Sequence, residues 1–226
     1  MDKAQVLSRI EQIGVIPAVR LASAQDAKFA VEAVAAGGIT VVEITMTVPG
    51  ALEVIVELTR STPDIVVGAG TVLDSDTAAR CIDAGAGFIT SPSLKLQVVE
   101  AAEKRNVIVI PGALTPTEVE TAWESGCEFV KVFPCSALGG PAYIRSLRKP
   151  FPHVRLIAAG GVNQNNAAEF ILLGANAVGI GASLISQDTI EYHQAKRIRE
   201  LARRYLALVA GAREELQARE RRSREQ

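Results

Sequence analysis

Two charged residues lie within apolar runs that otherwise predict buried strands. Lys131 is in the segment FVKVF and Glu43 is in the segment VVEIT. Apolar runs of this length, bounded by turn residues, are typical of strands covered on both faces, where an unpaired charge has a high desolvation cost. One interpretation is a structural ion pair in the core, because buried pairs of this kind need no catalytic role. The other interpretation is that both residues are there for chemistry.

The chemistry open to such a pair is nucleophilic catalysis by an amine. Burial disfavours the charged form of a lysine and so provides a free amine that can attack a carbonyl carbon. A carboxylate such as that of Glu43 can then transfer protons to and from the adduct. The pair requires no metal ion and no organic cofactor, and we expect neither. The two histidines, His153 and His193, have no metal-ligand or triad spacing, and we expect one in a loop and the other on a helix surface.

The composition predicts a globular protein that binds small molecules. The chain has 226 residues, of which 48% are hydrophobic, enough to form a full core. Its formal net charge of -1 gives no general attraction to nucleic acid or to an anionic membrane surface. The three cysteines lack paired spacing, so we expect free thiols. No signal-peptide pattern opens the sequence, and we therefore expect a cytoplasmic protein.

Eight short apolar runs rich in β-branched residues predict strands. They are VIPAV from Val15, TVVEIT from Thr40, IVVGAG from Ile65, FITSP from Phe88, VIVIPG from Val107, FVKVFP from Phe129, RLIAAGG from Arg155 and AVGIGA from Ala177. Segments with helical spacing lie between them, and many open on Ser, Asp, Thr or Asn and close on Gly. Eight strand-helix units of roughly 20 to 27 residues are typical of a (β/α)8 TIM barrel. A doubly wound open sheet is the main alternative, but uniformly apolar strands and the lack of a linker favour the barrel.

Further helices are expected at both ends of a single domain that comprises residues 1–226. Residues 1–14 predict an extra helix, Lys3 to Ile13, at the N-terminal end of the barrel. A long closing helix is expected from about Asp188 to Glu225. Its charged end, about residues 212–226, is rich in arginine, and we interpret it as a solvated helix end without assigning it a function.

Polar residues and glycines gather where the predicted strands end, which is where barrel enzymes carry their active sites. These positions are Arg20; Glu43, Thr45 and Thr47; Gly68, Gly70 and Thr71; Ser91 and Pro92; Pro111 and Gly112; Lys131 and Phe133; Gly160 and Gly161; and Gly181 and Ser183. We expect all of them to face one shared mouth. The last two groups follow the seventh and eighth strands, where barrels commonly hold a phosphate on backbone N–H groups, so we expect a phosphate site there.

Seven segments together resemble one enzyme family. They are VVEITMTVPGA, VGAGTVL, ITSPSL, IPGALTPTE, FVKVFPCSALGGPAYI, AAGGVN and GIGASL, and they occur in order between about Val15 and Leu184. The family is that of 2-keto-3-deoxy-6-phosphogluconate (KDPG) and 4-hydroxy-2-oxoglutarate aldolases. The resemblance implies a class I aldolase on a (β/α)8 barrel, usually a homotrimer, that cleaves KDPG to pyruvate and glyceraldehyde 3-phosphate.

The resemblance also implies a role for each site residue. Lys131, in the KxFP motif, forms a Schiff base with pyruvate, and Glu43 is the general acid and base. The pyruvate end of the site would comprise Arg20, Thr47, Thr71, Pro92 and Phe133. Gly160, Gly161 and Ser183, with Gly181 beside them, would bind the terminal phosphate.

Two positions differ from many members of the family. Thr47 stands where many have arginine, and Ala159 stands where many have threonine. The second difference bears on the hydroxyl groups of the substrate, so the galactonate epimer of KDPG or 4-hydroxy-2-oxoglutarate are alternative substrates. Two other classes remain open at this point. One is a barrel isomerase or synthase that binds sugar phosphates without a Schiff base, and the other is a non-catalytic trimeric barrel scaffold.

Overall fold

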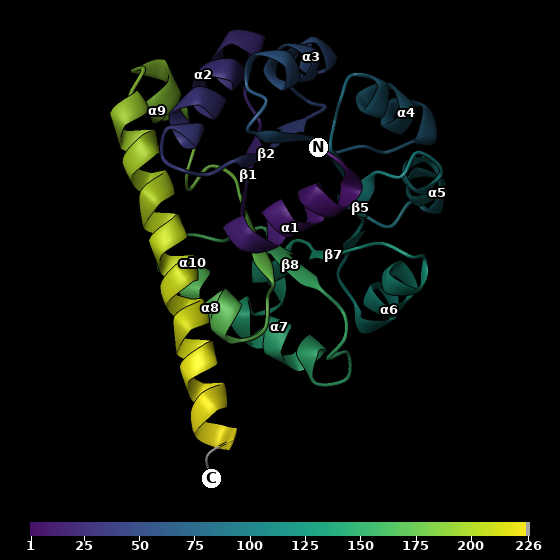
Figure 1. Ribbon diagram of the computed structural model, residues 1–226, viewed down its shortest axis with the longest axis vertical. Helices are drawn as coiled ribbons and strands as arrows, with labels where there is room; N and C mark the ends of the chain where they lie inside the picture. Colours follow the sequence, from purple (N-terminus) through teal and green to yellow (C-terminus); the bar gives the residue numbers. More distant parts are fainter. Residues whose placement is uncertain (225–226) are drawn as a thin grey trace.

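The (β/α)8 barrel predicted from the sequence is confirmed. The computed structural model describes residues 1–224, and its nine strands form one parallel sheet. In Figure 1 these strands form a ring within a circle of helices. The strands are β1 (Val15–Val19), β2 (Val41–Thr45), β3 (Val66–Gly70), β4 (Phe88–Thr90), β5 (Ile108–Ile110), β6 (Gly112–Ala113), β7 (Val130–Val132), β8 (Leu156–Ala159) and β9 (Ala177–Ile180).

The fifth predicted strand is divided in two, and this division closes the ring. The strand order is β5-β4-β3-β2-β1-β9-β8-β7-β6, so β5 and β6 lie at its two ends. They are separated in the chain only by Pro111, which has no N–H group to donate to a ladder. The Pro111 carbonyl still accepts a hydrogen bond from the Lys131 N–H at 2.9 Å. Together β5 and β6 take the place of one strand, which pairs with β4 on one side and with β7 on the other. The sheet is therefore an eight-stranded barrel, and the open doubly wound sheet is excluded.

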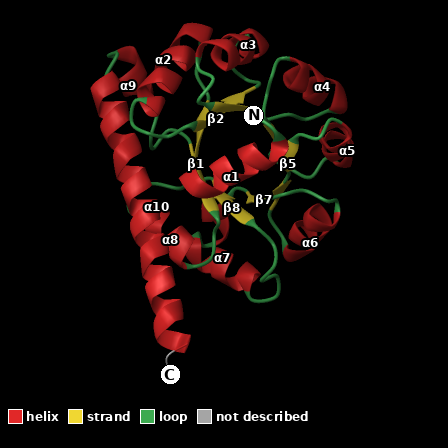
Figure 2. Cartoon of the chain, in the orientation of Figure 1, coloured by secondary structure: helices red, strands yellow, loops and turns green. Residues whose placement is uncertain are grey.

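Helices surround the barrel, and many begin at the capping residues that the sequence indicated. They are α1 (Lys3–Ile13), α2 (Ala24–Ala35), α3 (Ala51–Ser61), α4 (Ser75–Asp83), α5 (Leu96–Lys104), α6 (Pro116–Glu124), α7 (Pro141–Arg148), α8 (Ala167–Leu172), α9 (Gln187–Glu191) and α10 (Ala195–Arg224), with a 3-10 turn at Cys135–Leu138. Figure 2 shows α1 across the ring of yellow strands and the other helices in red around it. Ser23, Asp74 and Thr115 each accept a hydrogen bond from the third residue of the helix that follows. None of the helices between residues 1 and 224 has the length and apolar character that crossing a membrane requires.

Alternation along the strands divides the side chains between two regions. Val42 and Ile44 of β2, like Val130 and Val132 of β7, belong to the large core cluster between the sheet and the helices. The residues between them, Glu43 and Lys131, therefore face the interior of the barrel. This alternation is what brings two charged residues into the barrel without breaking the outer core.

Helix α1 closes the N-terminal end of the barrel, as the sequence predicted. A capping box of Asp2 and Gln5 starts the helix, and Gly14 ends it in the left-handed conformation at φ 65°. Its buried residues Val6 and Ile10 form one cluster with interior residues of the strands, including Phe88. The barrel is thus filled at this end, and access to its interior is left to the C-terminal ends of the strands.

The predicted single closing helix from about Asp188 to Glu225 is wrong at its start. The segment forms α9 and α10, separated by a turn in which His193 has φ 48°, a conformation that interrupts a right-handed helix. The His193 ring packs on Phe29 of α2, with 5.3 Å between ring centroids. His193 is therefore a turn residue rather than one on a helix surface, whereas His153 lies in a loop as predicted. Glu225 lies outside the described residues.

Helix α10 packs along α2 and α8, and its far end projects beyond the barrel (Figure 1). Ile198, Tyr205 and Val209 bury one face of the helix. Further along, Arg213 donates hydrogen bonds to the backbone carbonyls of Gln12 at 2.7 Å and Asn176 at 3.0 Å. The last helix is therefore tied to the first helix of the chain.

Candidate active site

The C-terminal ends of the strands surround a cavity of about 560 Å³. The residues predicted from the sequence that line it are Arg20, Glu43, Thr71, Pro92, Lys131, Phe133, Gly160, Gly161, Gly181 and Ser183. The structure thus brings together residues from β1, β2, β3, β4, β7, β8 and β9 or from the loops that follow these strands. Thr47 is the one residue given a role by the family resemblance that does not line the cavity. The other residues expected at the mouth that are not part of its lining are Thr45, Gly68, Gly70, Ser91, Pro111 and Gly112.

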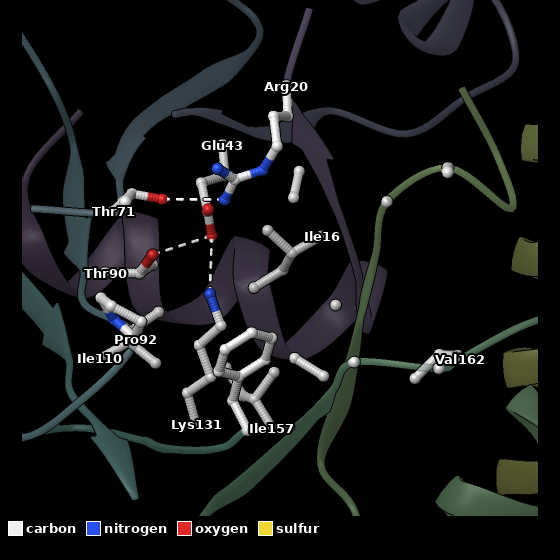
Figure 3. Close-up of a pocket in the computed structure, with 18 of the residues that line it drawn as sticks. Ile16, Arg20, Glu43, Thr71, Thr90, Pro92, Ile110, Lys131, Ile157 and Val162 are labelled. Carbon is white, nitrogen blue, oxygen red and sulfur yellow. Dashed lines mark hydrogen bonds and ion pairs between the residues drawn. The ribbon is translucent and has the colours of Figure 1, made fainter. Parts of the chain in front are cut away.

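Lys131 and Glu43 meet across the interior of the barrel. Their strands, β7 and β2, are separated by β8, β9 and β1, so they lie on opposite sides of the ring. The Lys131 Nζ is 3.5 Å from the Glu43 Oε2, and Figure 3 shows the two side chains pointing toward each other. Both are largely buried, with 14% of the lysine side chain and 5% of the glutamate side chain exposed. Each side chain therefore compensates the charge of the other, and both still line the cavity.

The Glu43 side chain passes close to Gly70 of β3, where an added Cβ would lie only 2.5 Å from the Glu43 Cγ and closer still to the carboxylate. Thr90 lies on β4, which pairs with the far edge of β3, and donates a hydrogen bond from its Oγ1 to the Glu43 Oε2 at 2.9 Å. Gly70 is therefore needed for close approach, and any side chain there would displace the carboxylate.

Thr90 was not predicted to be a site residue. It was included only as part of the fourth apolar strand, although it lines the cavity and is 2% exposed. The signal was available, because Thr90 stands two residues before Pro92, and residues two apart share a face of a strand. A polar residue on the inner face of a strand is the same feature that singled out Glu43 and Lys131.

Arg20 is held at the rim of the cavity by two hydroxyl groups. Its Nη2 donates to the Thr71 Oγ1 at 3.0 Å, and its Nη1 donates to the Thr47 Oγ1 at 3.2 Å. Thr45 in turn shares a 2.7 Å hydrogen bond with Thr47. Thr47 therefore contacts the arginine without lining the cavity itself, and the contact with substrate predicted for it stays a prediction.

Thr71 has an unfavourable backbone conformation. Its φ of 59° lies in the left-handed region, which a β-branched residue rarely adopts and which costs of order 1–3 kcal/mol. This conformation accompanies the hydrogen bond to Arg20. Strained residues of this kind cluster at functional sites, where the surrounding structure compensates the cost.

The walls around Lys131 are apolar. Ile16, Ile110 and Ile157 line the cavity, and the Lys131 Nζ lies 5.6 Å from the centroid of the Phe133 ring. An apolar wall excludes water and strengthens the electrostatic interactions inside the site. A carbonyl compound bound here would meet the lysine amine away from bulk solvent.

Glycines form the wall of the cavity after β8 and β9. Gly160 and Gly161 have φ values of 83° and 85°, and a side chain on Gly161 would collide with Ser136. Gly181 differs, because an added Cβ there would meet nothing within 4 Å. The protein itself therefore does not require glycine at position 181, and the open space beside its backbone is available to a ligand.

The three cysteines take no part in this site. All three are free, as predicted, and all three are buried. Burial raises the pKa of the Cys81 and Cys135 thiols to about 11 and that of Cys127 to about 12. Thiols with such pKa values are poor nucleophiles near neutral pH, because the thiolate is the reactive form.

The fold and the site together define a class of protein, the barrel enzymes that carry a lysine–carboxylate pair at the C-terminal mouth. Comparison with known proteins narrows the class. The chain belongs to the KDPG and KHG aldolase family of lyases, whose family model matches residues 6–201. The family predicted from the seven sequence segments is thereby confirmed.

Three known proteins illustrate this relationship. The "2-dehydro-3-deoxy-phosphogluconate aldolase" of Treponema pallidum is 37% identical over 74% of this chain and 79% of its own length. The "KHG/KDPG aldolase" of Escherichia coli K12 is 31% identical over 84% of this chain and 89% of its own length. The crystal structure of KDPG aldolase from Legionella pneumophila, "with pyruvate captured at low pH as a covalent carbinolamine intermediate", superposes with a TM-score of 0.81 at 30% identity. That similarity covers 87% of this chain and 96% of the Legionella chain.

Proposed function

We propose that this protein is a class I aldolase that cleaves KDPG to pyruvate and glyceraldehyde 3-phosphate through an imine on Lys131. The observation that carries the proposal is the separation of 3.5 Å between the Lys131 Nζ and the Glu43 Oε2 in an apolar cavity. A structural ion pair would need no cavity beside it, whereas an amine nucleophile needs both a proton-transfer partner and space for a carbonyl compound.

The first half of the reaction forms the imine. The free amine of Lys131 attacks the C2 carbonyl carbon of the substrate, and the oxygen takes up a proton to give a carbinolamine. Glu43 transfers protons in this step, and loss of the hydroxyl group as water leaves a protonated imine. The positive nitrogen then attracts the electron pair of the C3–C4 bond when that bond breaks.

The second half cleaves the substrate and releases pyruvate. Glu43 accepts the proton of the C4 hydroxyl, the C3–C4 bond breaks, and the aldehyde leaves with C4 as its carbonyl carbon. The remaining enamine takes up a proton at C3 and becomes the imine of pyruvate. Addition of water to this imine releases pyruvate and restores the Lys131 amine.

Groups around the pair bind the two ends of the substrate. Thr47 and Thr71 each accept a hydrogen bond from Arg20 and orient its guanidinium, whose other N–H groups bind the pyruvate carboxylate. The terminal phosphate binds at Gly160, Gly161, Gly181 and Ser183, which line one wall of the cavity, and the open space beside the Gly181 backbone permits close approach of a ligand. Ser183 lies in the loop after β9, and its backbone carbonyl faces the Tyr205 hydroxyl of α10 at 3.5 Å.

A second substrate class is favoured by Ala159. Its side chain lines the cavity and offers no hydrogen bond to a substrate hydroxyl. The pyruvate chemistry does not require such a bond, so 4-hydroxy-2-oxoglutarate and the galactonate epimer of KDPG are the alternatives to test. Parallel assays with these three substrates, each coupled to pyruvate detection, give the ratio of kcat/KM values that decides between them.

The protein is also proposed to be a homotrimer located in the cytoplasm. Both features come from the resemblance to the family and from the sequence, and light scattering of the purified chain tests the first. A monomer with full activity would contradict the homotrimer and leave the aldolase chemistry unaffected.

The test of the proposed function is borohydride reduction in the presence of pyruvate, followed by mass spectrometry of the peptides. We expect a reduced pyruvate adduct on Lys131, no adduct in Lys131→Ala, and no detectable cleavage of KDPG by that variant. Lys104→Ala is the matched control, because Lys104 is 78% exposed and lies on α5 outside the cavity. The absence of an adduct on any lysine of the wild-type protein would overturn the proposal and favour the isomerase or scaffold alternatives.

A further inference from the structure

Thr90 occupies the inner face of β4 at the level of the reactive pair. Phe88, two residues earlier, fills the N-terminal part of the barrel interior, whereas Ile89 between them packs in the outer core. Thr90 therefore points inward, and it lines the cavity although only 2% of its surface is exposed. Nearly all buried polar side chains in proteins have a hydrogen-bond partner, so one is expected for the Thr90 hydroxyl.

The partner of Thr90 is the same oxygen that faces the lysine. The Thr90 Oγ1 is 2.9 Å from the Glu43 Oε2, and the Lys131 Nζ is 3.5 Å from that oxygen (Figure 3). An ionised carboxylate can only accept hydrogen bonds, so the threonine hydroxyl is the donor. The shorter of the two contacts with the Glu43 Oε2 is therefore the one to Thr90.

The contact with Lys131 changes during the reaction, whereas the contact with Thr90 does not need to. Once the lysine nitrogen is part of an imine it carries the substrate and no longer has its full set of N–H donors. The hydroxyl of Thr90 is not consumed at any step. The torsion that rotates a glutamate carboxylate is broad, so a fixed hydrogen bond is an effective way to orient it.

We propose that Thr90 is a positioning residue for the aldolase reaction, whose hydroxyl holds the Glu43 Oε2 in place for proton transfer after the imine has formed. This inference rests on the function proposed above. It assigns to β4 a part in the chemistry of β2 and β7. The charged groups that face the same part of the cavity are Lys131 on β7 and Arg20 after β1.

The test compares Thr90→Val, which removes the hydroxyl at similar volume, with Thr90→Ser, which restores it. Misplacement of a reacting group by about 1 Å costs on the order of 100-fold in rate, so we expect kcat for KDPG cleavage to fall by about 10- to 100-fold in the valine variant. The KM should remain within about 2-fold, because Thr90 orients Glu43 rather than binding substrate. The serine variant should recover most of kcat.

A second assay isolates proton transfer from cleavage. An enzyme that interconverts the imine and enamine of pyruvate exchanges the methyl protons of pyruvate with D2O, and NMR measures the rate without any aldehyde. We expect Thr90→Val to slow this exchange by the same factor as kcat, while borohydride still traps the pyruvate adduct on Lys131. Slower exchange with continued trapping would show that the loss of the Thr90 hydroxyl affects proton transfer, a step that follows imine formation.

Thr189→Val is the matched control for loss of a buried threonine hydroxyl outside the site. Thr189 lies on α9, does not line the cavity, and donates from its Oγ1 to the Ser186 carbonyl at 2.7 Å, so the valine variant can lower the melting temperature but should leave both kcat and the exchange rate unchanged.

Three results distinguish the possible outcomes. Wild-type kcat and exchange in a folded Thr90→Val variant would overturn the positioning role, as would a loss of kcat that the serine variant does not recover. A lower melting temperature with unchanged kcat per folded enzyme would show that the Thr90 hydroxyl only stabilises the fold. That result would also overturn the positioning role. Failure of the proposed function is recognised separately, because the wild-type protein would then form no pyruvate adduct.

Discussion

Gly70→Ala is the substitution that most directly tests whether the position of Glu43 determines activity. The alanine Cβ would lie 2.5 Å from the Glu43 Cγ, whereas carbon atoms make favourable contact at about 3.5–4.0 Å. Glu43 must therefore move by about 1 Å, because Gly70 lies in a central strand and cannot shift easily. The φ of Gly70 is not positive, so alanine adds contact but no backbone strain.

The expected magnitude follows from this displacement. A shift of about 1 Å at a reacting group lowers the rate by on the order of 100-fold, and overpacking a core position costs about 1–3 kcal/mol of stability. We therefore expect kcat/KM for KDPG to fall by about 100-fold in a protein that still folds. The assay is pyruvate release coupled to lactate dehydrogenase, with a thermal melt to confirm the folded state.

The matched control is Gly211→Ala on α10, where an added Cβ meets nothing within 4 Å. A glycine in the middle of a helix is less favourable than alanine by about 0.5–1 kcal/mol, so this variant should melt at a higher temperature with unchanged turnover. Wild-type turnover in a folded Gly70→Ala protein would refute the reasoning, since it would mean that the close approach of Glu43 to Gly70 is not needed for catalysis.

Two further predictions concern the carboxylate and the thiols. Glu43→Gln should lower kcat by about 10²- to 10⁴-fold while borohydride still traps pyruvate on Lys131, and turnover equal to wild type would return Glu43 to a structural role. Cys81, Cys127 and Cys135 should react slowly with a thiol reagent at pH 8 in the folded protein, because burial raises their pKa values to about 11 or 12 and leaves the thiolate as a minor form. Denaturant should release all three thiols for rapid reaction, and rapid reaction of the native protein would contradict this.

The barrel was predictable because the pattern of apolar runs repeats with the period of one strand and one helix. Helix α1 was predicted with both of its ends, since Asp2 and Gly14 are strong start and stop signals. Lys131 and Glu43 stood out because a charge within an apolar strand has few explanations. These signals are local, and a single sequence is enough to identify them.

The errors arose where the outcome depends on contacts between distant segments. The turn at His193 follows no Gly or Pro signal, and its backbone conformation accompanies packing against Phe29 of α2. The hydrogen bond from Arg20 to the Thr47 hydroxyl also joins distant segments and could not be predicted from the sequence, and the role of Thr47 at the pyruvate end stays a prediction. Thr90 was overlooked because threonine is common in strands, although its spacing from Pro92 was a usable signal, and its distance from Glu43 places it beside the reactive pair.

Lys131 and Glu43 lie on strands at opposite sides of the barrel, so they come together only late in folding. The two residues are 88 positions apart in the sequence, and neither half of the barrel contains both. Contacts of such long sequence separation form late, because loop closure must precede them. Secondary structure can develop in each half while the reactive pair is still apart. Catalytic activity recovered after dilution from denaturant therefore reports formation of the complete barrel, whereas the recovery of helical structure does not.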